Sequence, residues 1–134
     1  MTNDAIEQLR LLVVEPECIL AGELADELRM AFNAEVVTIA NIEAYQEPQT
    51  HVHLAVLDCP PSLPALNVLF AKTLKLSNNF IVTHTHDLHT DDLAQGMIPQ
   101  GLNAIWLIKP YRIEALVEAA KHLLEKQGST EKAK

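Results

Sequence analysis

Short runs of apolar residues alternate along the chain with longer segments in which apolar residues recur at helical spacing. The short runs are rich in β-branched residues and end at polar residues or proline, which is typical of strands buried on both faces of a sheet. They predict five strands, at residues 11–14, 36–39, 53–57, 80–83 and 104–108.

The intervening segments predict helices. The clearest are amphipathic, with an apolar stripe facing inward and charged residues elsewhere. The expected helices span residues 19–32, 42–46, 65–76, 91–97 and 113–126. Residues 59–64 contain three prolines and are expected to form a loop. Residues 84–90 are expected to form a polar loop.

Strands that alternate with helices indicate an α/β fold in which both faces of a parallel sheet are covered. The chain is too short for a closed eight-stranded barrel, so an open, doubly wound sheet remains. We expect the flavodoxin-like arrangement of five strands, in the order 2-1-3-4-5. One domain would occupy residues 1–127, followed by a flexible polar tail at 128–134.

Composition excludes several classes of function. The formal net charge is -8, and up to residue 67 the chain has two basic residues against eleven acidic ones. A basic face for nucleic acid or an anionic membrane is therefore not expected. The four glycines fit neither GxGxxG nor a Walker A loop.

The sequence also shows no long apolar span or secretory signal, so the expected location is the cytoplasm.

Polar residues follow four of the predicted strands. Glu15 follows the first strand, Asp58 the third, and Lys109 the fifth, while Thr83 ends the fourth. Ligands of doubly wound sheets bind at this edge. Two neighbouring carboxylates repel each other and invite a cation, and Mg2+ prefers oxygen ligands. Together with a lysine and a hydroxyl, they suit a site that holds a phosphoryl group on a carboxylate.

At these residues the sequence resembles the receiver domain of two-component response regulators. The resemblance rests on "LLVVEPE", "HLAVLDCP", "FIVT" and "AIWLIKPY", in this order and spacing. It implies that Asp58 is the phosphoacceptor and that Lys109 contacts the phosphoryl group. It also implies that Thr83 is the switch hydroxyl and Trp106 the switch aromatic residue. The implied activity is signalling, with no enzymatic turnover beyond self-phosphorylation and dephosphorylation.

The resemblance further implies a Mg2+ cofactor, held by Glu15, Glu17 and Asp58. Pro16 stands where the family usually has a metal-binding aspartate. The implied partner is a histidine kinase or a phosphotransfer protein. A homodimer would form through the fifth strand and the last helix.

Two other functions remain open. Pro16 favours a phosphorylation-independent interaction module, as in receiver-like domains that have lost this chemistry. A small flavodoxin-like enzyme or binder is a third interpretation, which the lack of a phosphate loop after Val14 disfavours. His84, His86 and His89 suggest zinc binding or pH sensing, although a polar loop explains them more simply.

The two cysteines, Cys18 and Cys59, are too few for a disulfide framework. Their spacing is also not that of a CxxC redox motif, so buried structural thiols are the simpler expectation.

Overall fold

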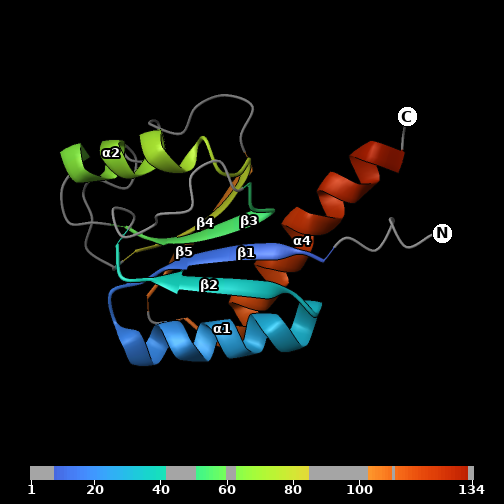
Figure 1. The fold of residues 1–134 in the computed structure, drawn as a ribbon, viewed down its shortest axis with the longest axis horizontal. Helices are drawn as coiled ribbons and strands as arrows, with labels where there is room; N and C mark the ends of the chain where they lie inside the picture. Colours follow the sequence, from blue (N-terminus) through green and yellow to red (C-terminus); the bar gives the residue numbers. More distant parts are fainter. Residues whose placement is uncertain (1–7, 42–50, 60–62, 85–102, 110, 133–134) are drawn as a thin grey trace.

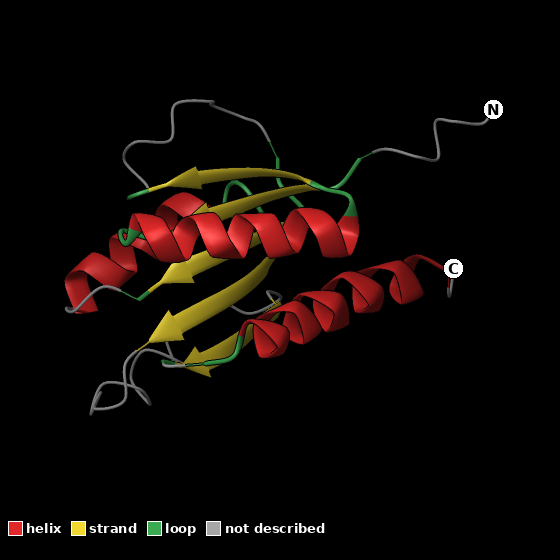
Figure 2. Cartoon of the chain, turned by 90° about the horizontal axis from the view of Figure 1, so that it is seen from below, coloured by secondary structure: helices red, strands yellow, loops and turns green. Residues whose placement is uncertain are grey.

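The computed structural model describes residues 8–41, 51–59, 63–84, 103–109 and 111–132. Its centre is a parallel five-stranded sheet with the order β2-β1-β3-β4-β5 (Figure 1). All strand arrowheads point the same way in Figure 2. The strands are β1 (Arg10–Val14), β2 (Glu35–Ile39), β3 (Leu54–Asp58), β4 (Asn79–His84) and β5 (Asn103–Ile108). This confirms the predicted strands, their order and the fold class.

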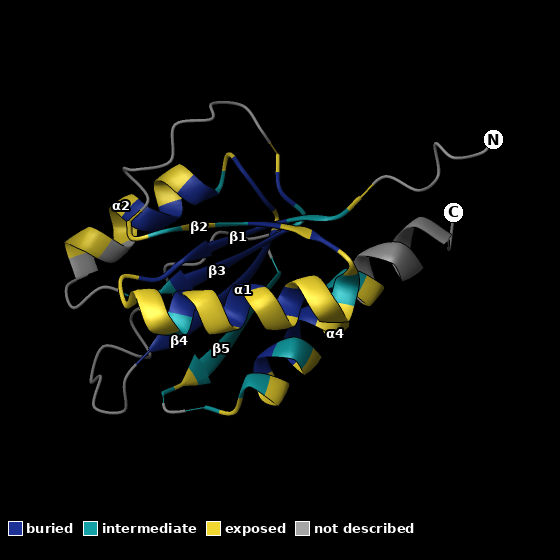
Figure 3. Ribbon diagram, turned by 60° about the horizontal axis from the view of Figure 1, so that its bottom comes forward, coloured by how far each residue is buried: buried dark blue, intermediate teal, exposed yellow. Residues whose placement is uncertain are grey.

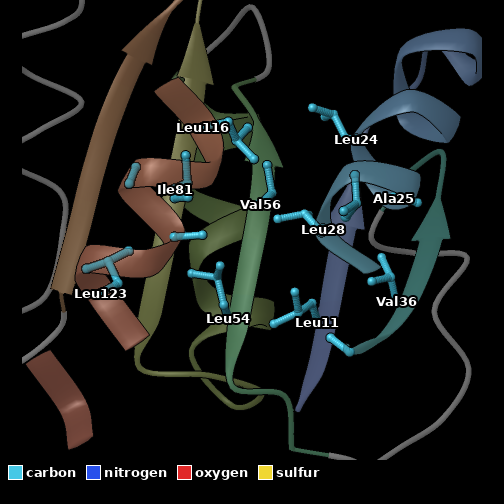
Figure 4. Close-up of a cluster of buried hydrophobic side chains, with 14 residues drawn as sticks. Leu11, Leu24, Ala25, Leu28, Val36, Leu54, Val56, Ile81, Leu116 and Leu123 are labelled. Carbon is cyan, nitrogen blue, oxygen red and sulfur yellow. The ribbon is translucent and has the colours of Figure 1, made fainter. Parts of the chain in front are cut away.

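Side chains along each strand alternate between the two faces of the sheet, and each face carries its own apolar core. One core lies between the sheet and helices α1 (Cys18–Phe32) and α4 (Ile113–Lys132). Figure 3 shows both helices on the same side of the sheet, and Figure 4 shows side chains of this core meeting between them. The second core, on the opposite face, packs against α2 (Leu63–Thr73).

Helix α1 matches its predicted span closely. Its inward stripe of Ala21, Leu24, Ala25 and Leu28 is buried. The helix ends at Asn33, whose backbone is left-handed with φ 52° and whose N–H donates to the carbonyl of Arg29 at 2.8 Å. Asparagine tolerates this conformation better than most residues, which explains the sharp stop before β2.

Several element boundaries differ from the prediction, and α2 ends at Thr73, three residues before the predicted end. Helix α2 begins at Leu63, inside the predicted loop, because Pro64 falls in the first helical turn, where its missing N–H leaves no bond unmade. Residue His84 belongs to β4 and pairs with Ile108. Helix α4 continues to Lys132, through residues 128–132 of the expected tail, although Gly128 and Thr130 are poor helix formers.

The expected helices at 42–46 and 91–97 lie outside the described residues. Among the helices that the structure describes, none combines the length and apolar character needed to cross a bilayer.

Candidate functional site

The alternation along the strands places the predicted site residues on one face. Leu11 and Val13 of β1 point toward α1 and α4, so the same alternation carries Glu15 to that side. In β3, Val56 points the same way, and Asp58 follows two residues later. Since β1 and β3 are neighbouring parallel strands, the two carboxylates meet at the carboxyl edge of the sheet.

The ammonium group of Lys109 contacts both carboxylates. Its Nζ atom lies 2.5 Å from Oδ1 of Asp58 and 3.2 Å from Oε1 of Glu15. The backbone of Lys109 is fixed by its N–H, which donates to the carbonyl of His84 at 2.6 Å. The three charged groups therefore converge from β1, β3 and the end of β5, as the sequence predicted.

The two carboxylates differ in exposure. The Glu15 side chain is 4% exposed, whereas the Asp58 side chain is 22% exposed. Oε2 of Glu15 accepts the backbone N–H of Glu17 at 3.1 Å, and its Oε1 accepts Lys109. Both oxygens of Glu15 thus have protein partners, and Asp58 is the more accessible acid.

Of the three expected magnesium ligands, Glu15 and Asp58 meet at Lys109, and Glu17 does not join them. Glu17 is exposed, and only its backbone N–H is turned to Glu15. Within the described ranges no group of three or more histidine, cysteine, aspartate or glutamate side chains has a metal-binding arrangement. The ammonium of Lys109 stands between the two acids instead. Glu15 and Asp58 nevertheless contact the same ammonium, and Mg2+ needs only one or two carboxylates together with water, so the magnesium site stays a prediction.

Thr83 is paired in register with Asp58, and its Oγ1 donates to the carbonyl of Leu57 at 3.5 Å. Trp106 lies on the other face of the sheet, against the core beside α2. There its ring meets the buried imidazole of His84 edge-on, with centroids 5.5 Å apart. The structure thus separates the two expected switch residues by the sheet, with His84 next to Thr83 in the chain and in contact with Trp106.

The sequence did not place Tyr111 at this site. Its ring packs against the core beside α1 and α4, and its hydroxyl is buried. The charges of Lys109, Glu15 and Asp58 all affect the pKa of this phenol. Its position two residues after Lys109, in the "KPY" segment, is the only sequence signal that could have suggested this.

Two pKa values at the site are shifted upward. Burial lowers the pKa of Lys109, but its hydrogen bonds to Asp58 and Glu15 and their negative charges outweigh this, so the net shift is upward. Burial raises the pKa of Tyr111 to about 12, with opposing effects from Lys109 and the two acids. Both groups are therefore held in their protonated forms by the folded chain.

We expect the protein to lose stability in strong alkali. A group whose pKa is higher in the folded state stabilises the fold below its unfolded pKa, and this contribution is lost as the pH rises through the folded value. For Tyr111 the loss falls between pH 10.0 and about 12, and that of Lys109 begins above 10.5. After allowance for solvent screening, Tyr111 contributes about 1 kcal/mol.

Urea denaturation across this pH range measures the effect. The midpoint should fall in the parent chain and fall less in Tyr111→Phe, which retains only the lysine contribution. A midpoint that stays level in the parent chain would contradict the proposed protonation states.

The other candidate residues lie outside this pocket or outside the described residues. His84 is buried beside Trp106, while His86 and His89 lie outside the described residues, so the zinc prediction stays a prediction. Cys18 is exposed, Cys59 is half-buried, and neither is in a disulfide.

Comparisons with known proteins show which solved structures share this fold. No family model and no curated protein sequence matches the chain. Among solved structures, a response regulator receiver domain protein from Clostridium thermocellum has a TM-score of 0.66 and 18% identity, over 91% of this chain and 98% of that chain. An orphan response regulator of H. pylori has a TM-score of 0.65 and 20% identity, over 87% and 96%.

A third structure comes from a family of redox sensors in the streptococci that evolved from two-component response regulators. Its TM-score is 0.74 at 19% identity, and the match covers 94% of this chain and 55% of that chain. At these identities the similarity establishes the fold. The chain has the CheY-like receiver fold, and its acidic pocket lies at the carboxyl edge of the sheet, where Asp58, Glu15 and Lys109 meet.

Proposed function

We propose that this chain is a receiver-type signalling domain that accepts a phosphoryl group on Asp58. The observation that carries the proposal is the contact between Lys109 and Asp58 at 2.5 Å, at the end of a central strand. Asp58 is the more accessible of the two acids, so an incoming phosphorus atom can reach its oxygen, whereas Glu15 is enclosed. The receiver fold of the solved structures supports the same function.

The proposed donor is a phosphohistidine on a kinase or phosphotransfer partner. An oxygen of the Asp58 carboxylate attacks the phosphorus atom, and the new P–O bond replaces the P–N bond to the imidazole. The imidazole leaves with the electron pair and takes up a proton. Lys109 contributes its positive charge, which offsets the charge of the phosphoryl oxygens as they approach a carboxylate.

In receiver folds Mg2+ supplies further charge neutralisation at the phosphoryl group. Glu15 and Asp58 would hold such an ion, and we assign no step of the transfer to it. Lys109 is the cation that this structure places against Asp58.

Phosphorylation of Asp58 would change the structure at the ends of β4 and β5. The backbone N–H of Lys109 is bonded to His84, and His84 packs against Trp106. A shift of the Lys109 side chain toward a phosphoryl group therefore acts on a residue that joins these two strands. We propose that Thr83 and Trp106 report this shift to the face formed by β5 and α4, where a partner or a second copy would bind.

A phosphorylation-independent interaction module is the second candidate. It is favoured by Pro16, by the engagement of both Glu15 oxygens, and by the ammonium that already neutralises Asp58. In this case the closed pocket would be structural, and the partner would recognise the surface of the fold without a phosphoryl signal.

Intact-mass measurement after incubation with acetyl phosphate or phosphoramidate, each with Mg2+, distinguishes the two. The parent chain should gain the mass of one phosphoryl group, and Asp58→Asn should gain none, because an amide is a poor nucleophile for this transfer. Asp26→Asn is the matched control, since Asp26 is an exposed acid on α1, and it should react like the parent.

An equal gain in the parent chain and in Asp58→Asn would contradict the assignment of the nucleophile. No gain on the folded parent chain with either donor would favour the interaction module.

A further inference from the structure

Helix α1 has an exposed face that combines large apolar side chains with acids. Ile19, Glu23, Asp26 and Met30 are all exposed, and their spacing of four, three and four residues places them on this one face, here called the α1 face. Ile19 is 71% exposed and Met30 is 80% exposed. Since the two acids lie between these apolar side chains, the α1 face suits a partner that offers both apolar contact and positive charge.

Helix α2 offers these complementary features on the other side of the sheet. Val68 is 46% exposed, Lys72 lies in the last turn, and Lys75 lies just beyond the helix end. Residues 63–77 contain these two lysines and no acid. The surface formed by Val68, Lys72 and Lys75 is here called the α2 face. Figure 1 shows α1 and α2 on opposite sides of the sheet, and Figure 3 shows exposed residues on both. The two faces can therefore meet only between different copies of the chain.

The order of side chains matches between the two faces. Counted backward from Met30, the α1 face has an acid after four residues and a second acid after seven. Counted forward from Val68, the α2 face has a lysine after four residues and a second lysine after seven. An antiparallel pairing of the two helices therefore sets Val68 against Met30 and each lysine against an acid.

We propose that the α1 face of one copy docks antiparallel on the α2 face of a second copy. Two α1 faces would bring acids together, and two α2 faces would bring lysines together, so charge favours contact between unlike faces. The exposed ion pair of Asp26 with Arg29, at 3.3 Å, is of a weak kind that does not prevent this exchange.

Such a contact is heterologous, because it joins two different surfaces. Each pair of copies keeps one unused face of either kind, so the contact repeats and builds assemblies larger than a dimer. A single helix on each side makes a small interface, which is typical of weak association at high protein concentration. The contact uses neither Asp58 nor Lys109, so it goes beyond the proposed phosphoryl transfer and does not depend on it.

Sedimentation equilibrium over a range of protein concentrations tests the inference. The weight-average mass of the parent chain should rise with concentration and pass that of a dimer. An α1 variant, Glu23→Lys with Asp26→Lys, should bring like charges together, and an α2 variant, Val68→Asp, should set a carboxylate against Met30. Each variant alone should associate at least tenfold more weakly than the parent chain. All the substituted side chains are exposed, and urea denaturation checks that both variants are folded.

Mixing the two variants gives the sharpest test. The α1 variant keeps an intact α2 face, and the α2 variant keeps an intact α1 face. An equimolar mixture should therefore form a one-to-one dimer and nothing larger, since the remaining two faces are both altered. Glu118→Lys with Glu125→Lys is the matched control, because it makes the same change in net charge at exposed positions of α4. This control should associate at least as strongly as the parent chain.

A parent chain that stays monomeric would overturn the inference, and so would a parent mass that levels off at the dimer, which indicates a two-fold contact. A mixture of the variants that stays monomeric would also overturn it. Equal weakening in the α4 control would assign the effect to net charge and not to the two faces. Because no phosphodonor is present, each of these results leaves the proposed role of Asp58 to be decided by its own test.

Discussion

Replacement of Lys109 by methionine should lower the free energy of unfolding by about 3 kcal/mol, the lower end of the range for breaking a buried ion pair. The ammonium stands between two carboxylates, one of which is 4% exposed. Methionine has a similar volume but no charge, so packing is retained while the acids lose their cation.

Urea denaturation at neutral pH measures this loss. Its cause is checked in a background that carries Glu15→Gln and Asp58→Asn, where neither acid is charged. Lys109→Met should cost much less there, because no carboxylate needs neutralising. A full loss of stability in that background would mean that Lys109 acts through its alkyl chain and not through its charge.

Replacement of Phe80 by alanine should lower the free energy of unfolding by about 4 kcal/mol. Phe80 is completely buried in the core beside α2, and its ring stacks on that of Phe70 with centroids 6.3 Å apart. Truncation therefore leaves a cavity between β4 and α2. Domains of this size are stable by about 5–15 kcal/mol, so the variant would be close to unfolding.

Thermal or urea denaturation measures the effect, and Val68→Ala is the matched control. Val68 is 46% exposed on α2, so its truncation should change stability by no more than about 0.5 kcal/mol. Similar losses in the two variants would contradict the assignment of Phe80 to a closely packed core.

The three central strands were predictable because they are buried on both faces, so that three or four consecutive apolar residues mark each of them. Right-handed crossovers leave few possible strand orders, and we expected the flavodoxin-like one among them. Once the carboxyl ends of β1, β3 and β5 are known to share one edge, Glu15, Asp58 and Lys109 must lie near one another. For this reason a backbone pattern alone was sufficient to locate the pocket.

Finer features depend on side-chain geometry that no pattern records. The sequence predicted that Lys109 would enter the pocket, but not that one ammonium would contact both acids, since this depends on rotamers and on the backbone bond to His84. Pro16 indicated a disturbed metal site. It did not show that the ammonium of Lys109 would lie between Glu15 and Asp58.

The boundaries of α2 and α4 show another limit. Three prolines between residues 59 and 64 predict a loop, but the last of them is compatible with the first turn of a helix. Polar residues near the end of the chain, with Gly128 among them, suggested a tail, although α4 continues through them to Lys132. Local composition does not decide between these alternatives at the end of an element.

Chemical localisation of the phosphoryl group tests the central claim most directly. Hydroxylamine attacks the acyl carbon of an aspartyl phosphate, releases phosphate and leaves a hydroxamate on that residue. After treatment with acetyl phosphate and then hydroxylamine, peptide mass spectrometry should find the hydroxamate on Asp58. A hydroxamate on Glu15, or phosphorylated protein whose Asp58 remains unmodified, would contradict the account.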